Sequence, residues 1–116
     1  DIIGLTGLLG SGRTELAMSL FGLNKTQAGV IKINGKEVDI NSPMVAKKYG
    51  IALLPEDRSR EGLFIERKIK ENISAPIIDA ICKKGIVNRK KENEIAEKYV
   101  EELKVRTPSI ETVVRW

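Results

Sequence analysis

A short apolar run, followed by a glycine-rich loop and a helical pattern, constrains the fold of this chain more than any other feature. Residues 2–6 (Ile-Ile-Gly-Leu-Thr) are almost wholly apolar, which is typical of a strand buried on both faces of a parallel sheet. After the loop at 7–14, residues 14–21 carry apolar side chains at helical spacing, and Gly22 fits a helix C-terminus. This order of strand, loop and helix predicts an α/β fold with the loop at a helix N-terminus.

The loop matches the phosphate-binding pattern G-x-x-x-x-G-K-[ST], except that Arg13 replaces the lysine. Its glycines let backbone N–H groups curl around a phosphate, and the hydroxyl of Thr14 is a candidate magnesium ligand. The planar guanidinium of Arg13 is bulkier than an ammonium, and Glu15 in the first helical turn repels a bound triphosphate. A plain glycine-rich turn is the alternative to this degenerate phosphate loop. The candidate nucleotide-binding residues are Gly7, Gly10, Ser11, Gly12, Arg13 and Thr14.

The next segment predicts an antiparallel hairpin and a short helix. Val30–Ile33 and Glu37–Ile40 flank Asn34-Gly35, a pair that readily adopts the positive φ angles of a type I′ turn. Ser42-Pro43 then supplies an N-cap with proline at the first helical position, and Gly50 ends the helix. We expect the hairpin to belong to an outer antiparallel sheet.

The rest of the chain predicts a second buried strand, a charged loop and two helices. The strand is expected at Ile51–Leu54, and residues 55–64 form the loop at its carboxyl end, where ligands of open α/β sheets bind. From Ile69 onward strand signals disappear, and helical patterns cover 69–83 and 89–104. An apolar stripe on the second helix is formed by Ile95, Tyr99 and Leu103.

Composition excludes several classes of protein. With 116 residues, 41% of them hydrophobic and 31% charged, the chain is expected to be one soluble domain, and its lack of a signal peptide and of a membrane-spanning apolar run predicts a cytoplasmic location. One cysteine and no histidine argue against a disulfide, a zinc site and a Ser/His/Asp hydrolase. The 4% aromatic content argues against a nucleic-acid module, and Asn24–Gln27 lacks the aspartate of a guanine-reading motif.

Four segments together resemble one protein family. They read GLLGSGRTEL at 7–16, LLPEDRSREGLF at 53–64, ENIS at 71–74 and TPSIETVVRW at 107–116. These segments are similar to the second nucleotide-binding half of the duplicated ATPase subunits that serve ribose, galactose and xylose import ABC transporters. The G-R-T-E form of the loop and the P-E-D-R-x-R-E-G-L run are the most specific parts.

The resemblance implies a partial ABC ATPase core of the P-loop NTPase type, with an antiparallel hairpin and a helical subdomain. Residues 1–64 would be the partial core, 65–106 the helical subdomain, and 107–116 the lead-in to an LSGG signature expected beyond Trp116. ATP and magnesium are the implied cofactors. Glu56 occupies the place of the family's Q-loop glutamine, so Thr14 and Glu56 are the implied metal-binding residues.

The resemblance also implies partners and a location. They are ATP, a transmembrane permease subunit and the first nucleotide-binding domain of the same subunit, on the inner face of the membrane. The candidates for permease contact are Arg58, Arg60, Arg67 and Lys68. No catalytic residue is assigned, because the family's catalytic groups lie beyond this chain, which alone is expected to be inactive. The alternative function is a small P-loop regulatory or nucleotide-binding module that is not linked to transport.

The resemblance places two later strands between the two buried strands predicted here. Without those two strands, Ile2–Thr6 and Ile51–Leu54 face a gap, with unpaired backbone groups and exposed apolar side chains. We expect the isolated fragment to close this gap by self-association, by strand exchange or by a different pairing of its strands.

Overall fold

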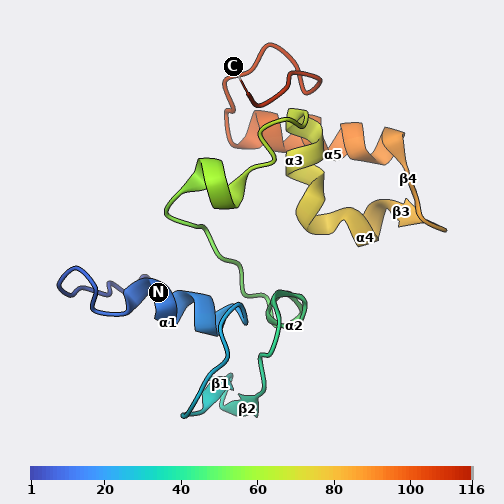
Figure 1. Cartoon of the computed structure of the whole chain (residues 1–116). Coiled ribbons are helices and arrows are strands. Elements are labelled where there is room, and N and C mark those ends of the chain that lie inside the picture. The colour runs from blue at the N-terminus through green and yellow to red at the C-terminus, as the bar shows by residue number, and fades with distance from the viewer. Residues whose placement is uncertain (116) are drawn as a thin grey trace. The chain divides into compact units, whose positions relative to one another are not determined.

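A computed structural model describes residues 1–115, which divide into an N-terminal unit (Asp1–Leu54) and a C-terminal unit that begins at Pro55. Figure 1 shows their elements. The N-terminal unit contains α1 (Arg13–Leu20), β1 (Ile31–Ile33), β2 (Lys36–Val38) and α2 (Pro43–Lys48). The C-terminal unit contains a π-helical turn (Arg58–Gly62), α3 (Ile69–Ser74), a 3-10 turn (Ala75–Ile77), α4 (Ile78–Ile81), β3 (Cys82–Lys83), β4 (Ile86–Val87) and α5 (Arg89–Glu102).

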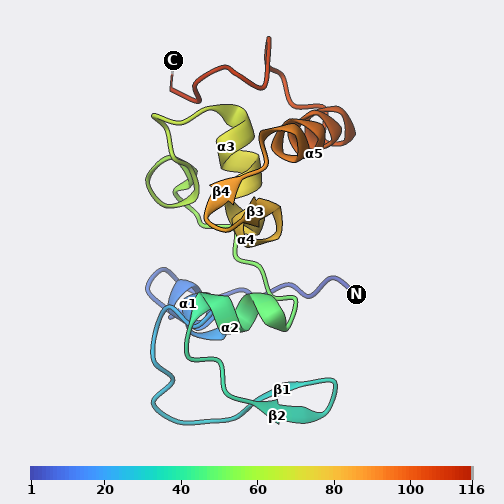
Figure 2. The ribbon, with the colours of Figure 1, turned by 90° about the vertical axis from the view of Figure 1, so that its right-hand side faces the viewer.

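The predicted first hairpin is confirmed. β1 and β2 pair antiparallel, with Ile31 opposite Val38, and they lie side by side in Figures 1 and 2. Asn34 and Gly35 both have positive φ angles, 51° and 78°, which is the requirement of a type I′ turn. The local turn sequence is therefore sufficient to set this register.

Both predicted helices of the N-terminal unit are also present, with their caps. α2 begins after Ser42, whose hydroxyl accepts a hydrogen bond from the Val45 amide at 3.4 Å. Gly22 and Gly50 follow α1 and α2 in the left-handed conformation, each with φ 77°. At Gly22 a Cβ atom would lie 2.7 Å from the backbone of Ser42, so the close approach of these segments requires glycine.

The two predicted buried strands are the main correction. Neither Ile2–Thr6 nor Ile51–Leu54 forms a strand, and both sheets among the described residues are two-stranded antiparallel hairpins. A strand of a parallel sheet needs neighbours for its N–H and C=O groups, and within residues 1–115 no strand pairs with these segments. The expected exposure of apolar side chains is confirmed, since Ile2 is fully exposed and Leu54 is 83% exposed.

The C-terminal unit is built on the packing of α3 against α5. The expectation that strand signals end before Ile69 was wrong, because β3 and β4 pair antiparallel between α4 and α5. Their turn places Lys84 and Gly85 at φ 52° and 78°. A lysine favours the left-handed conformation much less than asparagine does, so this turn carries a weaker sequence signal.

The buried face of α5 differs from its apolar stripe. Glu92 and Ala96 are its buried residues, whereas Tyr99 and Leu103 of the predicted stripe are exposed. Glu92 accepts a hydrogen bond from Ser74 of α3, and Ala96 lies one turn further along the same face of α5. None of the described helices is long and apolar enough to cross a membrane.

Candidate functional site

The glycine-rich loop forms a series of tight turns that ends at the start of α1. Gly10 and Gly12 have φ angles of 77° and 83°, and Gly12 is the N-cap residue of the helix. The Ser11 amide donates to the Leu8 carbonyl at 3.1 Å. These left-handed positions explain the spacing of the two glycines, because a side chain at either would be strained.

The N-terminus of α1 is suited to an anion. Its first intrahelical hydrogen bond is donated by Leu16 to Gly12 at 2.9 Å, so the preceding amides have no acceptor within the helix. Gly12 provides no side-chain cap, and Arg13 and Thr14 are exposed in the first turn. Open amides and a helix dipole fit a phosphate group. Glu15 lies in the same turn and opposes this attraction.

Gly7 is required for a steric reason. A Cβ atom at Gly7 would lie 2.6 Å from the hydroxyl oxygen of Ser11, closer than any van der Waals contact. The first and the last part of the loop therefore approach each other across this glycine. Of the elements that the pattern requires, the structure contains the loop and the helix, and it does not contain the preceding strand.

The charged loop at 55–64 lies in the C-terminal unit and is fastened to α3. The Asn72 side chain makes two hydrogen bonds with the backbone of Phe64. Its Oδ1 accepts from the Phe64 amide at 2.8 Å, and its Nδ2 donates to the Phe64 carbonyl at 3.1 Å. Asp57 caps the π-helical turn by accepting from the Arg60 amide at 3.1 Å. Glu56 is exposed at the start of this loop.

The candidate metal-binding residues belong to different units, Thr14 to the N-terminal and Glu56 to the C-terminal one. Their pairing at one metal ion therefore stays a prediction. Within residues 1–115, no three His, Cys, Asp or Glu side chains gather in the manner of a metal site.

An ionic cluster that the sequence did not suggest joins 109–115 to the start of α3. Glu111 accepts from Lys68 at 2.7 Å and also from the nearly buried Lys70, which donates in addition to Asn93 at 3.2 Å. Hydrogen bonds from Lys68 and Lys70 lower the pKa of Glu111 to about 2. We call Lys68, Lys70 and Glu111 the α3 clamp.

Backbone hydrogen bonds extend the α3 clamp. The first amides of α3, from Ile69 and Lys70, donate to the carbonyls of Thr112 and Ile110 at 2.9 and 3.1 Å. These two carbonyls therefore cap the helix, together with the Glu71 carboxylate, which accepts from the Lys68 amide at 2.9 Å. The partners lie about forty residues apart in sequence, so no local pattern could have revealed the contact.

A buried carboxylate forms a second cluster that the sequence did not suggest. Glu92 is 2% exposed and accepts from the Ser74 hydroxyl at 3.0 Å and from Arg89 at 2.9 Å. Glu92 and Arg89 are three residues apart, so the sequence indicates only an ordinary ion pair on the surface of a helix. The Ser74 contact, between two helices, explains why this carboxylate is buried.

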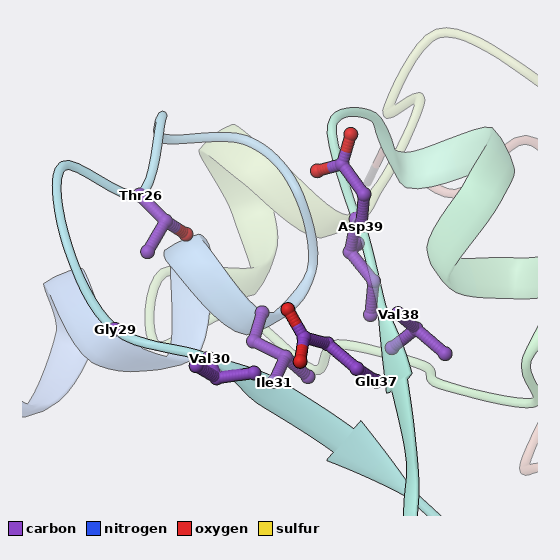
Figure 3. A pocket seen from close by; sticks show the side chains of 8 residues that line it. Thr26, Gly29, Val30, Ile31, Glu37, Val38 and Asp39 are labelled. Carbon is purple, nitrogen blue, oxygen red and sulfur yellow. The ribbon is translucent and has the colours of Figure 1, made fainter.

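A pocket of about 450 Å³ opens beside the hairpin of the N-terminal unit (Figure 3). Thr26, Glu37 and Asp39 contribute its polar groups, and Val30 and Ile31 line its apolar part. None of the candidate nucleotide-binding residues lines it. Two carboxylates give the pocket a negative charge, which does not suit a phosphate.

Several proteins of known family are similar in sequence to this chain over nearly its whole length. The xylose import ATP-binding protein XylG of Thermoanaerobacter pseudethanolicus is 49% identical over 95% of this chain. The galactose/methyl galactoside import ATP-binding protein MglA of Clostridium tetani is 44% identical, and the ribose import ATP-binding protein RbsA of Bacillus subtilis 37%, each over 99% of the chain. Each of these relatives is named as an import ATP-binding protein.

The chain spans only 22 to 23% of the length of these relatives. No solved structure matches it. The model of the ABC transporter family matches residues 1–114, which is nearly the whole chain. The chain therefore belongs to the ABC transporter family.

Proposed function

We propose that this chain is an ATP-binding segment of a sugar-import transporter subunit, with a degenerate phosphate loop at 7–14. The observation that carries the proposal is the open N-terminus of α1, where unpaired amides follow two left-handed glycines, in a chain whose relatives are named import ATP-binding proteins. The function of the subunit would be to couple nucleotide binding and hydrolysis to carbohydrate uptake.

The residues of the loop have distinct proposed roles. Backbone amides of Gly12, Arg13 and Thr14 bind phosphate oxygens, and the guanidinium of Arg13 adds positive charge. The hydroxyl of Thr14 is the proposed magnesium ligand, with Glu56 as a second. Magnesium, when bound, neutralises part of the triphosphate charge. Glu15 lowers the affinity because its carboxylate faces the same helix end.

The proposed macromolecular partners are a transmembrane permease subunit and the first nucleotide-binding domain of the same subunit, on the inner face of the membrane. Of the four cations considered for permease contact, Lys68 donates to Glu111, and Arg67 lies 3.9 Å from Glu71. Arg58 and Arg60 are exposed on the π-helical turn. They are the better candidates, because their charges are not engaged in an ion pair among the described residues.

Domain roles follow the same proposal. Residues 1–64 would contribute to the nucleotide-binding core, 65–106 would form the helical subdomain, and 107–116 would lead toward the signature. The Asn72 bonds to Phe64 support a link between the charged loop and α3, the first helix of the proposed helical subdomain. No residue of the chain is proposed as catalytic.

Calorimetric titration of the chain with ATP tests the nucleotide-binding proposal. We expect binding that is tighter with magnesium than with a chelator, and Thr14→Ala should remove this difference because it deletes the proposed metal ligand. Thr26→Ala, an exposed threonine of the same unit, is the matched control. Magnesium-dependent affinity that survives Thr14→Ala would refute the assignment of Thr14.

Self-association of the isolated chain is a separate proposal. It is supported by the exposed apolar side chains of Ile2, Ile3 and Leu54 in segments that have no sheet partner. Light scattering over a range of concentrations is expected to show species larger than the monomer. A monomer with a cooperative unfolding transition would contradict it.

A further inference from the structure

A strongly basic surface lies on the β3–β4 hairpin and the first turn of α5. We call it the basic hairpin patch, and its cations are Lys83, Lys84, Arg89, Lys90 and Lys91. All five side chains are exposed, and no acidic residue occurs between 80 and 91. In Figure 1 the hairpin tip protrudes at the edge of the C-terminal unit. The patch therefore concentrates five positive charges within nine residues.

Three of these cations lie where the dipole of α5 is unfavourable for positive charge. Arg89, Lys90 and Lys91 are the first three residues of α5, where the helix dipole is positive and acidic residues are preferred. Asn88 caps the helix by accepting from the Lys91 amide at 3.1 Å, so the cations are not needed to start it. A sequence that violates a local preference in this way is expected to gain from it elsewhere, usually at a functional surface.

The contacts within the unit neutralise only part of this charge. Arg89 pairs with the buried Glu92 at 2.9 Å, and Lys90 lies 4.0 Å from Glu94, which is a weak surface pair. Lys91 donates to the Ala80 carbonyl at 3.2 Å. Among the described residues, no hydrogen bond or ion pair involves the side chains of Lys83 and Lys84. The hairpin lysines are therefore available to an external anion.

The apolar content of the patch indicates the kind of partner. Ile86, between the two basic groups, is 74% exposed, and Val87 beside it is only half-buried. Residues 82–91 contain no aromatic side chain on which a nucleic-acid base could stack. Lysines and arginines around an exposed aliphatic residue fit the interface of an anionic bilayer, which attracts the charges and accepts the apolar side chain.

We propose that the basic hairpin patch is a docking surface for the anionic headgroups of a lipid bilayer. This inference rests on the proposed function in one respect, namely that the subunit works beside a membrane. It requires no nucleotide, and nucleotide titration and lipid binding measure different surfaces, so either proposal can fail without the other.

Co-sedimentation of the chain with lipid vesicles tests this proposal. Vesicles of phosphatidylcholine with one part in three of phosphatidylglycerol are compared with pure phosphatidylcholine, at low and at physiological ionic strength. We expect binding to the anionic vesicles that weakens with salt. Lys83→Gln with Lys84→Gln is expected to lower the partition coefficient about 25-fold, since each cation near an anionic surface contributes about fivefold.

Two further variants control for the position of the lysines and for loss of folding. Lys47→Gln with Lys48→Gln removes an equally exposed lysine pair from α2 and is expected to change binding less than about twofold. Lys90→Gln removes a cation from the positive end of α5, so it should weaken lipid binding without loosening the helix. If circular dichroism shows unchanged helix content in Lys90→Gln, its weaker lipid binding is caused by the lost charge and not by a loss of fold.

Three outcomes would overturn the proposal. The first is equal lipid binding by the α2 and the hairpin double variants. The second is equal binding to neutral and anionic vesicles at both salt concentrations, which would indicate adsorption through the apolar segments of the N-terminal unit. The third is tighter binding to a single-stranded oligonucleotide, lost in the hairpin variant, which would indicate a nucleic-acid partner instead.

Discussion

The two units of this chain differ in the kinds of side chain that they bury. In the N-terminal unit the buried hydrophobic residues are Ile40 and Ala46, and long apolar side chains such as Leu9 stay exposed. In the C-terminal unit Ile81 and Ala96 are buried, together with a polar group of Lys70, Ser74 and Glu92. The described residues of the C-terminal unit therefore bury polar side chains beside apolar ones, whereas those of the N-terminal unit bury apolar side chains alone.

The total surface area of the chain is large for two compact units. The chain exposes 9976 Å², whereas two separate compact units of half its mass would together expose about 7,600 Å². An excess of this size agrees with a chain that covers less than a quarter of its relatives' length. A helix pair needs only its own two segments, but a parallel strand needs neighbours from elsewhere in the polypeptide.

The largest expected effect comes from placing a charge at the two fully buried alanines. Ala96→Asp puts an unpaired carboxylate on the buried face of α5, and we expect it to cost about 3 kcal/mol or more and to unfold the C-terminal unit. Ala46→Asp is expected to loosen only α2. Hydrogen exchange followed by mass spectrometry measures both, and general loss of protection from Ala46→Asp would remove the distinction between the units.

The buried carboxylate of the C-terminal unit is expected to have the next largest effect. Glu92→Ala leaves the Ser74 hydroxyl and Arg89 without their partner and should lower the free energy of unfolding by about 2 kcal/mol. Glu94→Ala, on the exposed side of α5, should change it by less than about 0.5 kcal/mol. Urea denaturation followed by circular dichroism compares them, and equal losses would contradict the role of Glu92.

The α3 clamp is expected to fail in acid. The pKa of Glu111 is lowered to about 2 in the folded chain from an ordinary value of 4.5. A lowered pKa gives stability that is present above pH 4.5 and is lost as the pH falls toward 2. Protection of the Ile69 and Val114 amides should fall over this range and be already low in Glu111→Gln. An unchanged pH profile in Glu111→Gln would exclude the carboxylate as its cause.

Nucleotide affinity is expected to respond more weakly, because Arg13 and Glu15 are exposed and their charges are screened by solvent. Arg13→Lys should raise the affinity for ATP about twofold, and Glu15→Thr should raise it further, about threefold, by removing repulsion at the start of α1. Calorimetric titration measures both variants. Weaker binding than the parent chain in either variant would contradict the interpretation of these two residues as mismatches.

The smallest expected effect is on hydrolysis. The isolated chain should release no phosphate from ATP above a boiled control, because positioning an attacking water requires groups that we do not assign to this chain. Glu56→Gln, which introduces the amide usual at this place in the family, should not change that result. Magnesium-dependent phosphate release by the isolated chain would show that its loop and charged segment form a more complete site than proposed.

Local sequence was sufficient for the features that depend on neighbouring residues. Asn34-Gly35 predicted the hairpin turn, Ser42-Pro43 predicted the start of α2, and the glycines of the loop predicted its turns. Each of these is fixed by the φ preference of one residue or by a hydrogen bond across three residues. The family was also evident from four short segments, and the match over residues 1–114 agrees with it.

Only the tertiary structure decided the features that depend on distant residues. The apolar pattern of residues 2–6 is right for a strand, yet no strand forms, because pairing requires backbone groups that the described part of the chain does not place beside it. Glu92 is buried through a residue 18 positions away, and the α3 clamp joins residues 41 and 43 positions apart. A sequence specifies which groups can pair, but two groups far apart in the chain meet only when the fold between them closes, since ordering that loop costs entropy that the new contacts must offset.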